Sequence, residues 1–194
     1  SFQTKTTWNI SKQLQILSIG RDHWIKDYRS AILAMSILKE KQISFHYTIV
    51  GVHNPEELLL LVNDMNLKDS VTFLDSIPQQ HVYEKMLDSD LFLLPSVEEG
   101  IANVCIEAML SKLPVLSTDC GGMSELIVDS ETGFLVPTRN PKALADKISI
   151  FFKLQEIDIL QLVNAAYIKA TTQHTSKQMV DGMISLYKKV YENN

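Results

Sequence analysis

Two glutamates, Glu99 and Glu107, are the residues whose type and spacing suggest chemistry most directly, with seven residues between them. A carboxylate accepts hydrogen bonds in pairs, which suits the neighbouring hydroxyls of a ribose or a hexose. We expect Glu99 in a loop and Glu107 on the helix that follows, so that the two could hold two sugars of one ligand. The spacing alone is equally compatible with an ordinary loop acid and an ordinary acid on a helix surface.

Two cations, Arg21 and Lys26, lie in a predicted loop that leads into a helix. Arg presents a planar fork to phosphate oxygens and Lys a compact charge, and a helix N-terminus beside them would favour a diphosphate. Judged by position alone, two solvated surface cations are an open alternative. The loop lacks the Gly-x-Gly-x-x-Gly and Gly-x-x-x-x-Gly-Lys-Ser/Thr patterns, which argues against a nicotinamide dinucleotide site and a P-loop nucleotide hydrolase.

Glycines, histidines and cysteines add less. Gly121 and Gly122 follow a predicted strand, where they would either let backbone amides approach a ligand or form a tight turn. None of the five histidines is three or four residues from another, as a metal-binding pair on a helix would be. Cys105 and Cys120 match no metal-finger spacing, and Cys105 is expected to be a small buried residue. We therefore predict no metal site.

The elements that must position these residues alternate between short apolar runs and amphipathic stretches. Strands without in/out alternation, separated by helices, are typical of a parallel sheet buried on both faces. The predicted strands are 14–19, 45–50, 71–74, 91–94, 115–118 and 134–136. The predicted helices are 27–41, 54–65, 78–87, 103–110, 124–128, 140–153, 156–170 and 176–191, the second with Asn54 as its N-cap.

This pattern predicts an α/β fold: a Rossmann-like, doubly wound parallel sheet of about six strands flanked by helices, with an all-helical C-terminal segment. Without a Gly/Ser linker or an internal repeat, residues 1–194 are expected to form one domain. Ligands of such sheets bind at the carboxyl ends of the strands. The candidate residues follow those ends, as the prediction of a site requires.

The composition limits the possible partners. The chain has 194 residues, with 18 basic and 23 acidic side chains, so its net charge is 18 − 23 = −5. This balance argues against a nucleic-acid surface, although a local basic pocket for one phosphorylated ligand is compatible with it. No apolar run reaches the roughly 18–20 residues that span a bilayer. A reduced, cytoplasmic setting is the simplest interpretation of two cysteines. Because the chain starts at Ser1 rather than Met, we expect it to be a segment of a longer protein, with a processed protein as the alternative.

Several motifs then occur in a familiar order. They are PSVEEGIANVCIEAM at 95–109, PVLSTD at 114–119, GGMSE at 121–125 and TGFLV at 132–136, preceded by IGRDHWIK at 19–26. Together they resemble the retaining, nucleotide-sugar-dependent glycosyltransferases of family four, which have the GT-B fold. The resemblance covers about residues 14–191, nearly the whole chain.

The resemblance implies a role for each matching residue. Arg21 and Lys26 match the pair that neutralises the donor's diphosphate. Glu99 matches the glutamate beside the transferred sugar and the diphosphate, and Glu107 the one that holds the ribose hydroxyls. The backbone amides of Gly100, Ile101, Ala102 and Asn103 would face the diphosphate. No cofactor or divalent metal is implied, since cations and a helix N-terminus supply positive charge.

The sequence departs from the family pattern at three positions. Ala102 replaces a common glycine, which would place a β-carbon near the ligand. Asp27 replaces the glycine that often follows the lysine, which would place an acid beside the phosphates. Lys112 replaces a third glycine, at a position where a left-handed backbone is expected. The first two departures motivate an alternative, a glycosyltransferase-like scaffold domain without turnover.

A GT-B enzyme has two Rossmann-like domains, and this chain matches only the second, donor-binding one. The expected partners are thus a nucleotide-sugar donor and a missing N-terminal acceptor domain, with peripheral membrane association open for the full-length protein. The last predicted helix resembles the segment that crosses back to that domain. Without that partner, its apolar residues are expected to be partly exposed or repacked: Met179, Met183, Leu186 and Tyr187. The expected function is sugar transfer from a nucleoside-diphosphate donor to a glycan, lipid or small-molecule acceptor. The isolated domain is expected to bind donor and to transfer little. A sugar-nucleotide epimerase, which shares the fold, is a further alternative.

Overall fold

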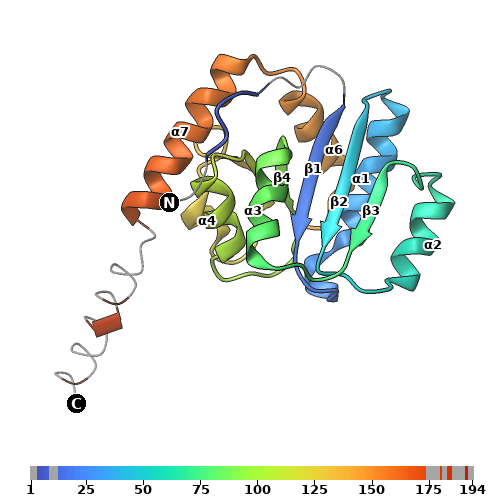
Figure 1. Ribbon diagram of the computed structural model, residues 1–194, viewed down its shortest axis with the longest axis horizontal. Coiled ribbons are helices and arrows are strands. Elements are labelled where there is room, and N and C mark those ends of the chain that lie inside the picture. The colour runs from blue at the N-terminus through green and yellow to red at the C-terminus, as the bar shows by residue number, and fades with distance from the viewer. Residues whose placement is uncertain (1–3, 9–12, 174–179, 181–182, 185–190, 192–194) are drawn as a thin grey trace.

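A six-stranded sheet with helices on both faces forms the body of the protein (Figure 1). The computed structural model describes residues 4–8, 13–173, 180, 183–184 and 191. The strands are β1 (Leu14–Ile19), β2 (Phe45–Val50), β3 (Val71–Leu74), β4 (Leu91–Leu94), β5 (Val115–Thr118) and β6 (Phe134–Val136). The helices are η1 (Trp24–Lys26, a 3-10 turn), α1 (Tyr28–Glu40), α2 (Glu56–Asp64), α3 (Gln79–Asp88), α4 (Asn103–Leu110), α5 (Met123–Leu126), α6 (Pro141–Phe151) and α7 (Glu156–Gln173). The predicted fold class and all six strand ranges are confirmed.

The sheet separates two apolar cores. Buried side chains of α1, α2 and α6 pack on one face of the sheet, and those of α3, α4 and α5 pack on the other. Helix α7 packs against α4 and contributes to both clusters. Strands covered on both faces need apolar side chains in both directions, which is why their sequences show no alternation.

All strand pairs are parallel, in the order β3-β2-β1-β4-β5-β6. The chain therefore leaves β1 toward one edge and returns at β4 to build the other half. At this reversal the loops after β1 and β4 diverge to opposite faces, which opens a crevice at the carboxyl ends of the two strands. The candidate residues Lys26 and Glu99 lie on those two loops.

Local conformation differs from the prediction at two helix starts. Helix α2 begins one residue later than expected: Pro55 is the N-cap and makes no side-chain cap bond, while Asn54 has a left-handed backbone (φ 42°). Asn tolerates that conformation, and the proline after it disfavours a helical Asn54. Ahead of α1, the predicted loop contains the turn η1, and Asp27 is left-handed (φ 44°). Its carboxylate accepts a hydrogen bond from the Ser30 amide at 3.2 Å.

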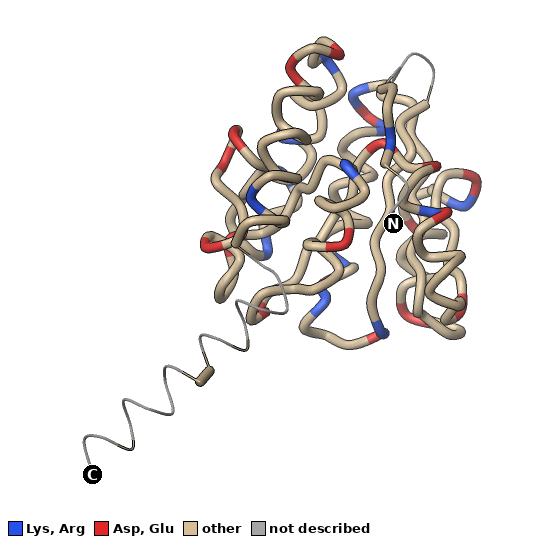
Figure 2. Tube along the Cα trace, turned by 60° about the vertical axis from the view of Figure 1, so that its left-hand side comes forward, with Lys and Arg blue, Asp and Glu red and all other residues tan. Residues whose placement is uncertain are grey.

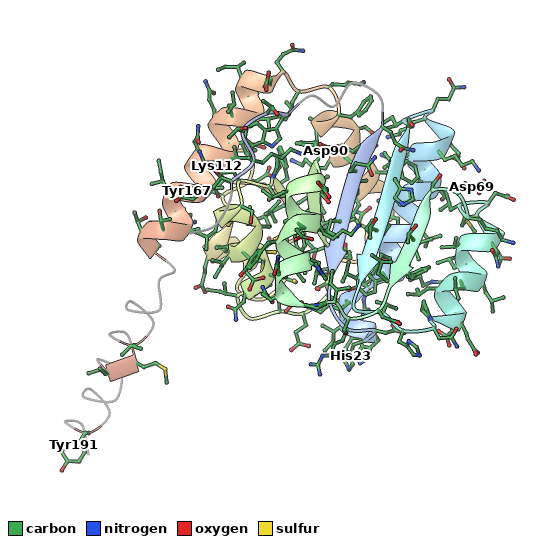
Figure 3. The ribbon with its side chains drawn as sticks, viewed as in Figure 1. His23, Asp69, Asp90, Lys112, Tyr167 and Tyr191 are labelled. Atoms are coloured by element: carbon green, nitrogen blue, oxygen red, sulfur yellow. The ribbon has the colours of Figure 1, made fainter. Side chains whose placement is uncertain are left out.

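A polar contact ties α4 to the C-terminal helix α7. Lys112 adopts the expected left-handed backbone (φ 56°), and its Nζ donates to Asn164 Oδ1 at 2.9 Å and lies 5.4 Å from the Tyr167 ring centre. Figure 3 labels Lys112 and Tyr167 at this contact. Lys112, in the turn after α4, thus contacts two residues of α7.

Beyond α7, most of the predicted helix 176–191 lies outside the described residues, including Met179, Leu186 and Tyr187. Met183 is described and is exposed, as expected. Figure 2 shows acidic and basic residues interspersed along the chain rather than gathered in one stripe. Among the described helices none is long and apolar enough to cross a membrane.

Candidate functional site

An ion pair joins the two loops at the reversal point of the sheet. Lys26 Nζ, at the end of η1, lies 2.6 Å from Glu99 Oε1, in the loop between β4 and α4. The two side chains are only 21% and 16% exposed. The Val97 amide also donates to the Ile25 carbonyl at 2.8 Å, so backbone and side chains hold the loops together. The structure thus brings together two of the predicted site residues, 73 positions apart in the sequence.

A buried serine, Ser96, donates a hydrogen bond that positions Glu99. Ser96 is fully buried, and its hydroxyl donates to Glu99 Oε1 at 2.8 Å. Both this bond and the bond from Lys26 go to the same oxygen, which leaves Oε2 available to a ligand. The Ser96 carbonyl accepts from the Thr118 hydroxyl of β5. Sequence reasoning assigned no role to Ser96; its place at the carboxyl end of β4, three residues before Glu99, was the available signal.

The glycine pair after β5 supports the same loop. Gly121 has φ +54°, and a β-carbon on it would lie 1.7 Å from the Glu99 carbonyl oxygen. The Gly122 amide donates to the carbonyls of Glu99 and Gly100 at 3.3 and 3.2 Å. Neither of the two open interpretations describes the Gly122 amide, because it donates to carbonyls of the loop between β4 and α4.

The start of α4 offers free amides at this site. Ala102 is the N-cap and provides no side-chain hydrogen bond. The amides of Asn103 and Val104 lack an intrahelical partner, whereas those of Cys105 and Ile106 donate to the Ala102 carbonyl. Gly100 and Ile101 are exposed on the same loop. Ala102 is 7% exposed and belongs to the apolar core on the α4 face, and the expectation that its β-carbon lies near the ligand stays a prediction.

Glu107 lies one helical segment further, on α4, and is half-buried. Burial raises its pKa above the ordinary glutamate value, and a hydrogen bond with Gln79 at the start of α3 opposes that shift. A partly desolvated carboxylate with one such partner has acceptor capacity left for ligand hydroxyls. Gln79 follows β3 in the chain and carries no sequence signal that would have found it.

The loop between β1 and α1 also carries Arg21, Trp24 and Asp27. Arg21 is exposed, and no ion pair or hydrogen bond between described residues involves its guanidinium, so its assignment to the diphosphate is still a prediction. Asp27 caps α1 rather than pairing with Lys26. Trp24 is 65% exposed and does not pack under the loop. Burial raises the pKa of the Cys105 thiol far above its usual range, as suits the expected small core residue.

The chain is similar in sequence to a known protein family and to curated enzymes. The family model for glycosyl transferases group 1 matches residues 3–169. The chain belongs to this family. It is 34% identical over 181 residues to the amylovoran biosynthesis glycosyltransferase AmsK of Erwinia amylovora, covering 89% of this chain and 44% of AmsK. An N-acetylgalactosaminyltransferase of Campylobacter jejuni, named for N,N'-diacetylbacillosaminyl-diphospho-undecaprenol, is 25% identical over 185 residues, covering 95% of this chain and 47% of that enzyme. The chain thus spans less than half the length of these curated relatives.

Solved structures agree on the fold of this family member. The C-terminal domain of a group 1 glycosyl transferase (LpcC) from Francisella tularensis matches with a TM-score of 0.75 at 24% identity, covering 84% of this chain and 87% of that one. Anabaena Alr3699/HepE, solved in complex with UDP-glucose, matches with a TM-score of 0.79 at 20% identity, covering 91% of this chain and 50% of that one. The second match shows that a longer chain contains this fold as about half of its length.

Proposed function

We propose that this chain is the donor-binding half of a retaining glycosyltransferase that moves a hexose from a nucleoside-diphosphate sugar to an acceptor. The observation that carries the proposal is the Lys26–Glu99 pair beside the uncapped start of α4, at the reversal point of the sheet. A cation, a carboxylate and free amides there offer partners to both parts of a sugar diphosphate. Membership of the glycosyl transferases group 1 supports the assignment.

In this proposal the positive groups act on the leaving group. As the bond to the sugar breaks, negative charge grows on the departing diphosphate. Lys26, Arg21 from its exposed position, and the amides of Gly100 to Asn103 meet that charge without rearranging water. Lys26 is already held in place by Glu99, so its ammonium group is oriented before the donor arrives.

The two glutamates divide the donor between them. Glu99 offers Oε2 to the hydroxyls of the transferred sugar, while Oε1 stays bonded to Ser96 and Lys26. Glu107 holds the ribose hydroxyls. Because the protein's own cations and amides balance the diphosphate, we propose that no divalent metal is required; chelation with EDTA should leave nucleotide binding unchanged, and its loss would contradict this part.

The acceptor half belongs to the rest of the protein. We propose that an N-terminal domain supplies the acceptor pocket, and that the full-length protein works in the cytoplasm or at the inner face of the membrane. The isolated chain would then bind donor and transfer little. Two substitutions had motivated a scaffold without turnover, Asp27 and Ala102. Their side chains cap α1 and pack in the core, so they leave the charged pair intact.

Calorimetric titration of the chain with UDP, GDP and ADP sugars tests the proposal. We expect one of these donors to bind. Glu107→Ala should weaken binding of both the nucleoside diphosphate and the intact donor, whereas Glu99→Ala should weaken the intact donor more than the diphosphate. Absence of binding by all three donors, with the chain shown to be folded by thermal melting, would refute the donor site.

Two cellular or enzymatic results would favour the alternatives. Unchanged glycan synthesis in cells whose full-length protein carries Arg21→Ala together with Glu107→Ala would favour a scaffold. Epimerisation at C2 of a nucleotide sugar by the full-length protein would favour an epimerase.

A further inference from the structure

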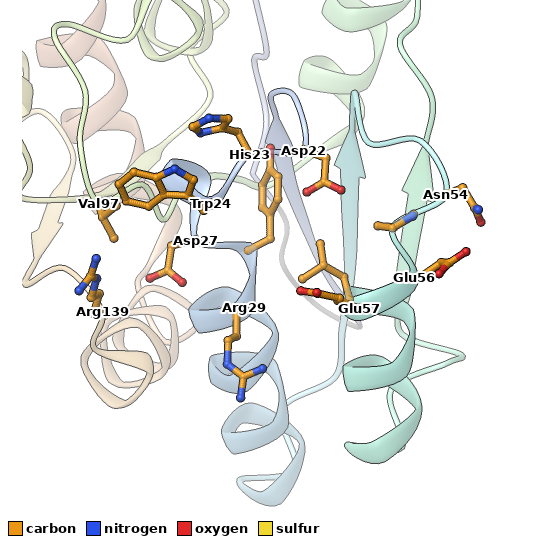
Figure 4. A pocket seen from close by; sticks show the side chains of 13 residues that line it. Asp22, His23, Trp24, Asp27, Arg29, Asn54, Glu56, Glu57, Val97 and Arg139 are labelled. Atoms are coloured by element: carbon orange, nitrogen blue, oxygen red, sulfur yellow. The ribbon is translucent and has the colours of Figure 1, made fainter.

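A second cavity lies on the other side of the loop that carries Lys26. Its volume is about 580 Å³, and its lining residues come from the segments after β1, β2, β4 and β6. Figure 4 shows it running across the first turn of α1, from Trp24, Asp27 and Arg139 at one end to Asn54 and Glu56 at the other. The cavity therefore opens at the same carboxyl edge of the sheet as the donor site.

Trp24 presents a wide apolar ring at this cavity. The ring is 65% exposed, whereas Trp8, the other of the chain's two tryptophans, is 3% exposed. Burial of an aromatic side chain stabilises a folded protein, and the exposed indole of Trp24 does not contribute this stabilisation. The turn η1 keeps the ring at the mouth of the cavity, with the His23 ring beside it at a centroid distance of 5.8 Å.

Asp27 supplies an acceptor that no described residue uses. One oxygen of its carboxylate, Oδ1, receives the Ser30 amide. The other, Oδ2, is buried and has no hydrogen-bond partner among the described residues. A buried carboxylate oxygen without a partner is costly. Because Oδ2 is out of contact with solvent, the Asp27 side chain must turn toward the cavity before a ligand hydroxyl can donate to it and relieve that cost.

Only one side chain separates the cavity from the donor pair. Tyr28 lines the cavity, and its hydroxyl donates to the Gly20 carbonyl at 3.0 Å. A β-carbon placed on Gly20 would lie 2.9 Å from the Tyr28 hydroxyl oxygen and 3.0 Å from Lys26 Cε. The Tyr28 and Lys26 side chains are therefore neighbours. Burial, followed by the charges of Asp22 and Glu99, raises the pKa of Tyr28, so the phenol stays protonated. A ligand in the cavity is thus one tyrosine ring away from the donor site.

The charges of the lining decide between ligand classes. Four carboxylates, of Asp22, Asp27, Glu56 and Glu57, stand against the two guanidinium groups of Arg29 and Arg139. The excess of acids disfavours an anion, and the two arginines disfavour a cation. A flat aromatic ring together with several acceptors and a few donors suits a neutral ring rich in hydroxyls.

We propose that this cavity binds a neutral glycan, the terminal sugars of the acceptor, with one pyranose stacked on Trp24 and its hydroxyls donated to Asp27 Oδ2 and the neighbouring carboxylates. The assignment of that glycan as the acceptor rests on the proposed function; the sugar site itself does not. The glycan would enter along the groove from Asn54 and Glu56 and meet the donor beside Tyr28. The donor half would thus take part in choosing the acceptor.

Tryptophan fluorescence of the 194-residue chain tests this directly, because Trp24 is its exposed indole. The probes are maltotriose, α-1,6-mannotriose and raffinose, which between them present neutral glucose, mannose and galactose rings. We expect at least one to change the emission saturably, with a dissociation constant of about 1–10 mM. In Trp24→Phe the fluorescence change should disappear, since buried Trp8 does not report. Amide NMR shifts at 22–29 should persist in that variant and be lost in Trp24→Ala.

Leu60→Ala is the matched control, because Leu60 is similarly exposed (63%) and lies on α2 outside the cavity lining. It should leave sugar binding unchanged. Asp27→Asn retains one carbonyl acceptor and should weaken binding about tenfold or less, while Trp24→Ala should weaken it by more than tenfold.

The outcomes separate this proposal from the donor site. UDP binding should be the same in Trp24→Ala as in the unaltered chain. If UDP binds and none of the three trisaccharides changes the Trp24 signal, the acceptor-glycan proposal is overturned while the donor site stands. If a trisaccharide binds equally well to Trp24→Ala, the proposal is also overturned, since the sugar then binds elsewhere.

Discussion

The two sides of the loop between β1 and α1 satisfy their polar groups in opposite ways. On the donor side, Lys26 and Glu99 bond to each other and Ser96 completes the set, all within largely buried side chains. On the cavity side, Trp24 is exposed and Asp27 Oδ2 has no partner among the described residues. One turn of 3-10 helix carries both arrangements.

The difference corresponds to the ligands that each side is proposed to take. A buried unpaired charge is expensive, so a site for a charged ligand gains from an internal counter-ion that the ligand later shares. The exposed indole carries no charge, and the unpaired Asp27 Oδ2 is a cost that a ligand with hydroxyl donors would offset. The donor side should therefore be sensitive to changes of charge, and the cavity side to changes of shape.

The largest effect should come from Gly121→Ala, which damages the donor side alone. The new β-carbon would meet the Glu99 carbonyl at 1.7 Å from a left-handed backbone, so the loop must move. We expect a loss of about 3 kcal/mol in unfolding free energy, a fall in Tm of about 6–12 °C, and loss of UDP binding. Gly100→Ala is the control: nothing lies within 4 Å of its β-carbon. Equal Tm values for the two variants would contradict the close approach.

Lys26→Ala and Arg29→Ala each remove a cation from one side of the loop, and the two variants should differ in their affinity for UDP. Lys26→Ala deletes the partner of Glu99 and a diphosphate ligand, and should weaken UDP binding about 10- to 100-fold, since hydrogen bonds between charged groups contribute about 1.5–3 kcal/mol. Arg29→Ala removes an exposed cation from the cavity side and should leave UDP binding unchanged. Calorimetric titration of both variants with UDP checks this. Equal losses of UDP affinity would show that the two sides of the loop are not separate sites.

A smaller effect is expected for Ser96→Ala, which frees Glu99 Oε1 from one of its two donors. Affinity for the intact sugar donor should fall about 3- to 10-fold, from a hydrogen bond worth about 1 kcal/mol, and affinity for UDP should fall less. Ser117→Ala removes an equally buried hydroxyl that bonds to the Thr118 carbonyl instead. It should have no effect on the ratio of the two affinities. If both variants change that ratio alike, Ser96 does not position Glu99.

Much of this arrangement could be predicted from the sequence. The six strands followed from continuous apolar runs. The roles of Lys26 and Glu99 followed from the resemblance to family four, because their positions after β1 and β4 alone left ordinary surface charges open. What the sequence did not reveal was set by tertiary approach: which way Trp24 points from η1, that Ser96 reaches Glu99, and that Gln79 meets Glu107. The sequence also did not reveal that Ala102 is packed in the core, because a helix N-cap can face the core as well as a ligand.

The smallest effect concerns pH. Burial raises the pKa of Glu107, so its carboxylate takes up a proton at a higher pH than a free glutamate does. Since ribose hydroxyls are held by the ionised form, UDP affinity should fall as the pH drops through that raised pKa, by about tenfold or less. The folded chain binds this proton more readily than the unfolded chain, so the raised pKa favours folding at low pH, and this contribution is lost as the pH rises through it. Glu107→Gln should flatten the affinity profile and raise the Tm of the ligand-free chain at neutral pH.

We propose that the loop between β1 and α1 has a donor side and a separate glycan side. Amide NMR of the chain with UDP-glucose or, should another base prove to bind, the corresponding donor tests it most directly. We predict that donor shifts gather at 20–21, 25–26, 99–107 and 121–122, while trisaccharide shifts gather at 22–24, 27–29 and 54–58. Donor shifts confined to the cavity residues, or no shifts at 99–107, would contradict the account.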